Sequence, residues 1–149
     1  MRNTSFAAVI LSLAACGDKP VFASAYLGTT IEAGHVMINS GAGYVRWDTP
    51  NRPHGAVRAT VTAASDGRFR FALAGCALEV ELQGNSGQVV ASPPAVCEVD
   101  IDHFRGSLVV VGQVEVTRDT GAVKVSLFAN NNTISPHVEW SLNYDARPE

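Results

Sequence analysis

The sequence predicts a small all-β domain: an antiparallel meander of about eight or nine short strands, forming a barrel or a sandwich. Apolar and polar residues alternate in short runs, which is the period of a half-buried strand, and almost no helical periodicity follows residue 25. The 13 glycines and the many valines and threonines favour strands over helices. No internal repeat divides residues 26–149, which we therefore expect to form a single β domain.

The first strands are predicted at residues 29–38, 43–47 and 56–62. The last of these places Val57, Ala59 and Val61 on one face and an arginine and two threonines on the other.

Between the second and third of these strands, residues 48–55 are predicted to form a loop that is stiffened by two prolines. Trp47, Arg52 and His54 make it a candidate binding loop, because a stiff loop that carries aromatic and arginine side chains loses little entropy on docking. A plain connection between strands is the alternative.

Residues 68–73 and 76–83 are predicted to pair as a hairpin. If Ala74 and Gly75 form a two-residue turn, apolar side chains face each other on one side and opposite charges on the other. The predicted pairs are Leu73 with Cys76, Phe71 with Leu78, Phe69 with Val80, Arg70 with Glu79 and Arg68 with Glu81. Such turns favour positive φ at the first position, which suits Ala74 poorly, so a bulge is the alternative.

The same test selects a register further along the chain. With a four-residue loop at 118–121, Glu115 meets Lys124 on one face, and Val114 and Val116 meet valines on the other. Residues 130–133 are predicted to be a loop. In the last strand Val138, Trp140, Leu142 and Tyr144 alternate with polar residues, so we expect these four side chains in the core.

The N-terminus has one positive charge, at Arg2, followed by an apolar run over residues 6–15 that is too short to span a bilayer. The run ends in Leu13-Ala14-Ala15-Cys16, which resembles the lipobox of bacterial lipoproteins. The resemblance implies that residues 1–15 are a signal peptide, that Cys16 carries the lipid, and that residues 16–25 are a lipidated tether. An ordinary secretory signal and a buried N-terminal helix are the alternatives.

The same resemblance implies a cell-envelope protein that is held to a membrane by its acyl chains. An Asp directly after the lipidated Cys is the inner-membrane signal of Gram-negative lipoproteins, and Gly17 holds that position here. We therefore expect the periplasmic face of the outer membrane. Export would place Cys76 and Cys97 in an oxidising compartment, which favours a disulfide between them, with a metal or reactive thiol site as the alternative.

The sequence argues against several other kinds of chemistry. The net charge of −3 without a basic patch argues against a nucleic-acid partner. Glu98, Asp100 and Asp102 share one face and could bind Ca²⁺, but no glycine-containing turn lies between them, so we expect a solvated face. Adjacent Asp102 and His103 would point to opposite faces of a strand, which excludes a catalytic triad. The four histidines are scattered in the sequence, so we expect no metal and no cofactor.

These observations predict a non-catalytic envelope lipoprotein with a structural or protein-binding role. Two alternatives remain: a lipocalin-like carrier of a small apolar ligand or lipid, which needs an open apolar cavity of roughly 300 Å³ or more, and an inhibitor of a periplasmic enzyme.

Overall fold

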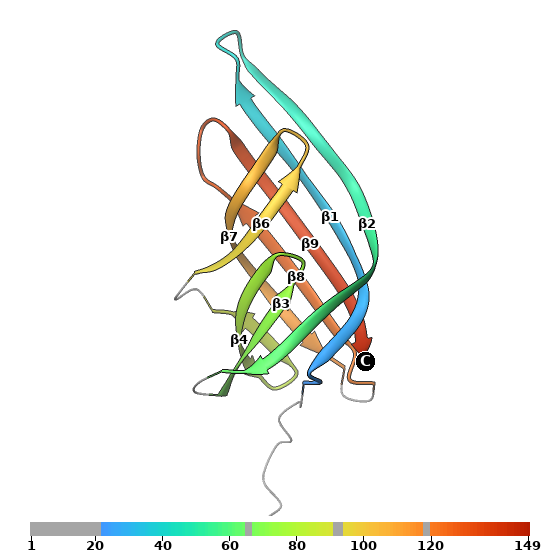
Figure 1. Ribbon diagram of the computed structural model, residues 1–149. Coiled ribbons are helices and arrows are strands. Elements are labelled where there is room, and N and C mark those ends of the chain that lie inside the picture. The colour runs from blue at the N-terminus through green and yellow to red at the C-terminus, as the bar shows by residue number, and fades with distance from the viewer. Residues whose placement is uncertain (1–21, 65–66, 91–93, 118–119) are drawn as a thin grey trace, which may run out of the picture.

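A computed structural model of the chain describes residues 22–64, 67–90, 94–117 and 120–149, and the elements with described bounds are all β-strands (Figure 1). The predicted all-β class is confirmed. The described strands are β1 (Ala25–Asn39), β2 (Tyr44–Ala63), β3 (Arg68–Leu73), β4 (Cys76–Gln83), β5 (Ser86–Val89), β6 (Ala95–Ile101), β7 (Phe104–Val116), β8 (Val123–Asn130) and β9 (His137–Pro148).

The strands form one antiparallel sheet that curls into a barrel-like ring of eight. Consecutive strands pair from β1 to β4 and from β7 to β9, and β9 returns to pair with β1 over 12 positions. The ring is completed where β5 bridges β4 and β7. Because β1 and β9 are paired, side chains from the two ends of the chain are brought together.

The sheet forks beside β7. Its first half, up to Val110, pairs with β6, and its second half pairs with β5, so β5 and β6 share one position in the ring. β6 contacts β4 at two paired positions, and one of these joins Cys76 directly to Cys97. The predicted disulfide is confirmed, with Cα atoms 4.1 Å apart. It links β6 covalently to β4, with which β6 shares only two backbone-paired positions.

Both predicted hairpin registers are confirmed. Leu73 pairs with Cys76 and Arg70 with Glu79, and in the second hairpin Glu115 pairs with Lys124. The turn between β3 and β4 has two residues, and Ala74 adopts φ of 46°. The backbone therefore accepts an alanine in a left-handed conformation, and the bulge we considered is not formed.

Large apolar side chains fill the inside of the ring. Alternating residues of β3, β4, β8 and β9 point inward, and Tyr26, Phe71, Leu78 and Tyr144 are completely or almost completely buried. Trp140 is 2 % exposed, so the last strand contributes its predicted residues to the core. The hydroxyl of Tyr144 faces the carbonyl oxygens of Tyr26 at 3.2 Å and Val57 at 3.1 Å. Burial raises the pKa of the Tyr26 and Tyr144 hydroxyls.

The prediction of a loop at residues 48–55 is wrong, because β2 runs through this segment without a break. Two register shifts against β1 accommodate it, one near Pro50 and one opposite Gly28 and Thr30, where Ala56 adopts φ of 55°. Among the described strands, β2 pairs with β3 only at residues 59–63, so its first three quarters form an open edge of the described sheet. Prolines are tolerated at bulges and on open edges, where a missing N–H breaks no ladder.

The predicted tether also ends earlier than residue 25. Phe22 is 9 % exposed and packs edge-on against Phe69 and Phe71, with ring centroids 4.6 and 4.9 Å apart. The folded domain therefore includes Phe22. The predicted signal peptide at 1–15 and Cys16 lie outside the described residues. None of the described segments forms a helix long and apolar enough to cross a bilayer.

Candidate functional site

The candidate binding residues around the Pro-rich segment contact other parts of their own domain. The ring of Trp47 stacks on His103, with centroids 4.4 Å apart. Arg52 pairs with Asp102 across 3.3 Å. Asp102 also donates its backbone N–H to the hydroxyl oxygen of Thr49, at 3.2 Å. These contacts form a seam between the open edge of β2 and the turn that joins β6 to β7.

His54 is held in a similar way. Its Nε2 lies 3.7 Å from Oε2 of Glu32, and Oε1 of the same carboxylate accepts a hydrogen bond of 2.7 Å from the indole N–H of Trp140. The Glu32 side chain is 14 % exposed. Trp47, Arg52 and His54 therefore lie on one strand, and each already has an intramolecular partner.

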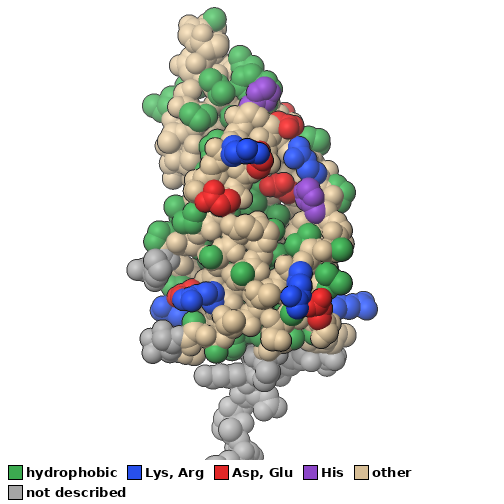
Figure 2. All heavy atoms as spheres, viewed as in Figure 1, with side chains coloured by type: hydrophobic (Ala, Val, Ile, Leu, Met, Phe, Trp, Pro, Cys, Tyr) green, Lys and Arg blue, Asp and Glu red, His purple; other side chains and the backbone are tan. Residues whose placement is uncertain are grey.

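The carboxylates on the outer face of β6 are bound by side chains of the neighbouring strand β7. Glu98 accepts a hydrogen bond from the Ser107 hydroxyl, and Asp100 pairs with Arg105. The hydrogen bond from Arg105 lowers the pKa of the Asp100 carboxyl. Figure 2 shows basic and acidic side chains side by side over the visible face, so its charge is locally balanced. The carboxylates of this strand thus have separate partners and do not converge on one point.

An open pocket on the outside of the sheet is a better candidate for binding. It has a volume of about 560 Å³ and lies between β7 and the end of β8. Its apolar wall is formed by outward-facing Val109, Val111 and Phe128, which are 57 %, 58 % and 45 % exposed. Val111 and Phe128 are directly paired across the two strands. We call this feature the β7–β8 pocket.

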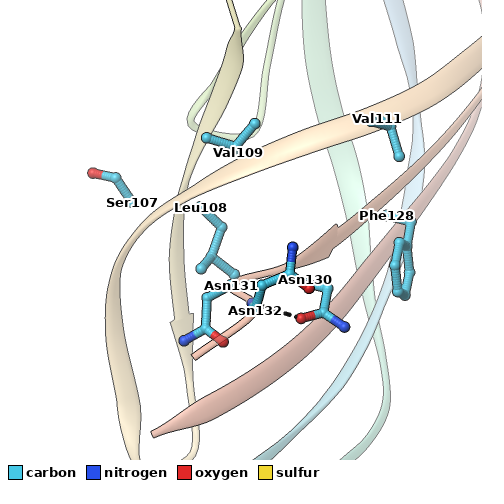
Figure 3. A pocket seen from close by; sticks show the side chains of 8 residues that line it. All are labelled: Ser107, Leu108, Val109, Val111, Phe128, Asn130, Asn131 and Asn132. Carbon is cyan, nitrogen blue, oxygen red and sulfur yellow. Dashed lines mark hydrogen bonds between the residues drawn. The ribbon is translucent and has the colours of Figure 1, made fainter. Parts of the chain in front are cut away.

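Asparagine side chains form the polar side of the β7–β8 pocket (Figure 3). The carboxamide of Asn131 donates to the carbonyl oxygen of Pro136 at 2.7 Å and accepts the backbone N–H of Val138 at 3.0 Å. Asn130 accepts the backbone N–H of Asn132 at 2.8 Å. These bonds hold the β8–β9 loop against the sheet, so the rim of the pocket is ordered by its own hydrogen bonds.

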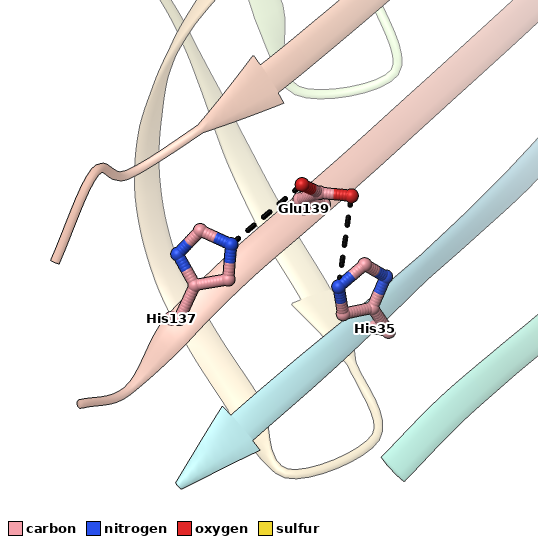
Figure 4. Close-up of side chains that lie close together, drawn as sticks. All are labelled: His35, His137 and Glu139. Carbon is pink, nitrogen blue, oxygen red and sulfur yellow. Dashed lines mark ion pairs between the residues drawn. The ribbon is translucent and has the colours of Figure 1, made fainter. Parts of the chain in front are cut away.

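A second outer groove, of about 300 Å³, crosses β2, β1, β9 and β8 and shares Phe128 with the β7–β8 pocket. His35 and Glu139 line it. Nε2 of His35 lies 3.6 Å from Oε2 of Glu139, and Nε2 of His137 lies 3.6 Å from Oε1 of the same carboxylate (Figure 4). One ligand atom from each residue lies within 4.8 Å of the others, an arrangement that could hold a metal ion.

No family model and no curated protein sequence matches the chain. Its function is therefore inferred from the surface itself.

Sequence reasoning did not find this His–Glu cluster. His137 and Glu139 alternate on one strand, so their shared face was visible in the sequence. His35 is 102 positions before His137, and no local pattern shows that β1 and β9 are neighbours. The paired register places His35 directly opposite Glu139. The useful signal would have been a prediction that the first and last strands pair.

Proposed function

We propose that the chain is a lipid-anchored envelope protein whose β domain binds an extended, neutral segment of another envelope protein and has no catalytic role. The β7–β8 pocket carries the proposal. Three apolar side chains, Val109, Val111 and Phe128, are each about half exposed there beside a rim of amides. An exposed apolar patch bordered by polar groups is typical of a protein interaction site.

The lining of the pocket favours a peptide over other ligands. None of the side chains that line it is charged. A peptide segment presents apolar side chains together with backbone N–H and C=O groups. The valines and the phenylalanine can pack against the apolar side chains of the peptide. The asparagine amides can exchange hydrogen bonds with its backbone N–H and C=O groups.

Carriage of an apolar ligand inside the ring is disfavoured. The inner face is occupied by buried aromatic and branched side chains, among them Tyr26, Phe71 and Tyr144. The two pockets described above are lined in part by residues of the outer face. A carrier requires an open apolar interior, whereas the available apolar surface here is external.

The position of the pocket is compatible with a membrane anchor. Figure 1 places the start of β1 and the β8–β9 loop toward opposite ends of the sheet. A chain anchored through Cys16 would enter the domain at the β1 end. The β7–β8 pocket would then face away from the membrane surface, where a partner can reach it.

Site-specific photo-cross-linking in the native host tests the binding surface. A photoreactive residue at Val109 should give a discrete adduct that is lost in a Phe128→Asp background. The matched control is the same probe at Leu27, which is apolar, 46 % exposed and on β1. Circular dichroism checks that Phe128→Asp remains folded. The same adducts from both positions, or adducts unaffected by Phe128→Asp, would contradict the proposal.

The anchor is tested separately by Cys16→Ser. We expect this variant to lose lipid labelling and to appear as an uncleaved precursor or in the soluble fraction. Unchanged lipid labelling and unchanged membrane retention would refute the lipobox interpretation without affecting the binding surface.

A further inference from the structure

We propose that His35, His137 and Glu139 form a binding site for Zn²⁺ on the outer face of the sheet. The sequence predicted no metal site, and the protein-binding proposal does not need one. None of the three residues of this cluster lines the β7–β8 pocket, although the neighbouring groove shares Phe128 with it. It follows from the way in which β1 and β9 place two imidazoles on either side of one carboxylate (Figure 4).

The distances suit a shared ion better than direct hydrogen bonds. Each imidazole Nε2 lies 3.6 Å from a different oxygen of Glu139, which is too long for a hydrogen bond. Ligand atoms bound to one tetrahedral Zn²⁺ at about 2.0–2.1 Å are separated by roughly 3.4 Å. Each nitrogen–oxygen separation is thus close to the value for two ligands of one ion, and one ligand atom from each of the three residues lies within 4.8 Å of the others.

The second nitrogen of His137 strengthens this inference. Its Nδ1 lies 3.2 Å from the backbone carbonyl oxygen of Thr133. A carbonyl can only accept, so this contact requires the proton of a neutral imidazole to be on Nδ1. The lone pair of Nε2 then points toward the Glu139 carboxylate, where a cation between them removes the repulsion. A carbonyl that orients a histidine in this way is the usual support of a metal ligand.

The surroundings leave the cluster ordered but accessible. The side chains of His35, His137 and Glu139 are 14 %, 21 % and 39 % exposed. All three project from paired strands, which hold ligands more rigidly than loops do. Asp48 is paired with His35 on its other side, but its carboxylate is bound by Arg46 at 2.7 Å. With one oxygen of Glu139 bound, the protein supplies three ligand atoms, which leaves a fourth position for water or for a partner's side chain.

Two neutral nitrogen ligands and one carboxylate suit a borderline ion such as Zn²⁺, whereas Ca²⁺ and Mg²⁺ prefer oxygen ligands alone.

Zinc titration of the full chain, purified without a histidine tag and stripped with chelator, tests the proposal. By calorimetry we expect one Zn²⁺ per chain. His137→Gln and Glu139→Gln should each weaken binding by at least about tenfold. His54→Gln and His103→Gln are matched controls, because they remove the histidines outside the cluster, and should leave the affinity unchanged. Co²⁺ should give the intense visible absorption of a four-coordinate site in the wild type and lose it in Glu139→Gln.

Thermal unfolding in chelator shows whether each variant is folded before its affinity is compared. If His137→Gln does not fold, His35→Asn replaces it. The proposal is overturned if the wild type shows no saturable binding below about 1 mM Zn²⁺, or if the control variants lose as much affinity as the cluster variants.

Discussion

Removal of the Cys76–Cys97 disulfide should destabilise the domain by about 3 kcal/mol. The two cysteines are 21 positions apart, and closing a loop of this length accounts for about 3 kcal/mol in the chain-entropy model. Little else holds β6 to β4, because these strands pair only at Cys76–Cys97 and Ala77–Val96. The Cys76→Ala/Cys97→Ala variant, compared with the oxidised wild type in urea, measures the loss of unfolding free energy.

Because β6 lies at the fork beside β7, we expect the loss of the disulfide to loosen β6 before the other strands. Hydrogen exchange in the variant should accelerate first along β6, where the Glu98 N–H donates to the carbonyl oxygen of Gly75 at 3.1 Å. Amides of β8 and β9 should stay protected and serve as the internal control. Wild-type protein treated with reductant should behave like the variant. A stability loss below about 1 kcal/mol, or uniform acceleration over all strands, would refute the view that the disulfide is the main link between β4 and β6.

Three further predictions concern the core and the seam. Tyr144→Phe should cost about 1–3 kcal/mol of unfolding free energy, because it removes the donor shared by one buried and one partly buried carbonyl oxygen. Burial raises the pKa of Tyr144 and Tyr26 above the ordinary value of 10.0. The stability that these two neutral hydroxyls contribute is thus complete below about pH 10 and is lost as the pH rises through their folded-state pKa. Urea titrations at rising pH should therefore show a smaller decline in unfolding free energy for Tyr144→Phe than for the wild type. Phe22→Ala should lower the unfolding free energy by about 3 kcal/mol. An unchanged urea midpoint would indicate that Phe22 belongs to the tether and not to the folded domain. Trp47→Ala should cost about 1 kcal/mol or less, because Trp47 closes a half-exposed seam against His103.

Parts of the fold could be predicted because two independent patterns constrained the same register. In the β3–β4 hairpin, a shift of one position would turn one strand over relative to the other, so that either Arg70 or Glu79 would be buried and either Phe71 or Leu78 would be exposed. Only one register satisfies both the core and the charges.

The error at residues 48–55 has a physical origin. Pro50 and Pro53 usually end a strand because they lack an N–H, and a sequence pattern does not show which edge of a strand is unpaired. Pro53 lies opposite Ile31 in a strand that lacks an outer neighbour over the described residues 44–58. The His35–Glu139 contact was missed for a related reason, since ring closure depends on the whole sheet and no local signal records it.

The open edge of β2 also bears on how the domain behaves in a crowded compartment. An unpaired strand of this length could template the addition of a strand from another copy, which is the first step of polymerisation. Pro50 and Pro53 cannot donate to such a strand, and the register shift near Pro50 changes the twist of the edge. The residues that make this segment look like a loop thus protect a long exposed hairpin from adding further strands.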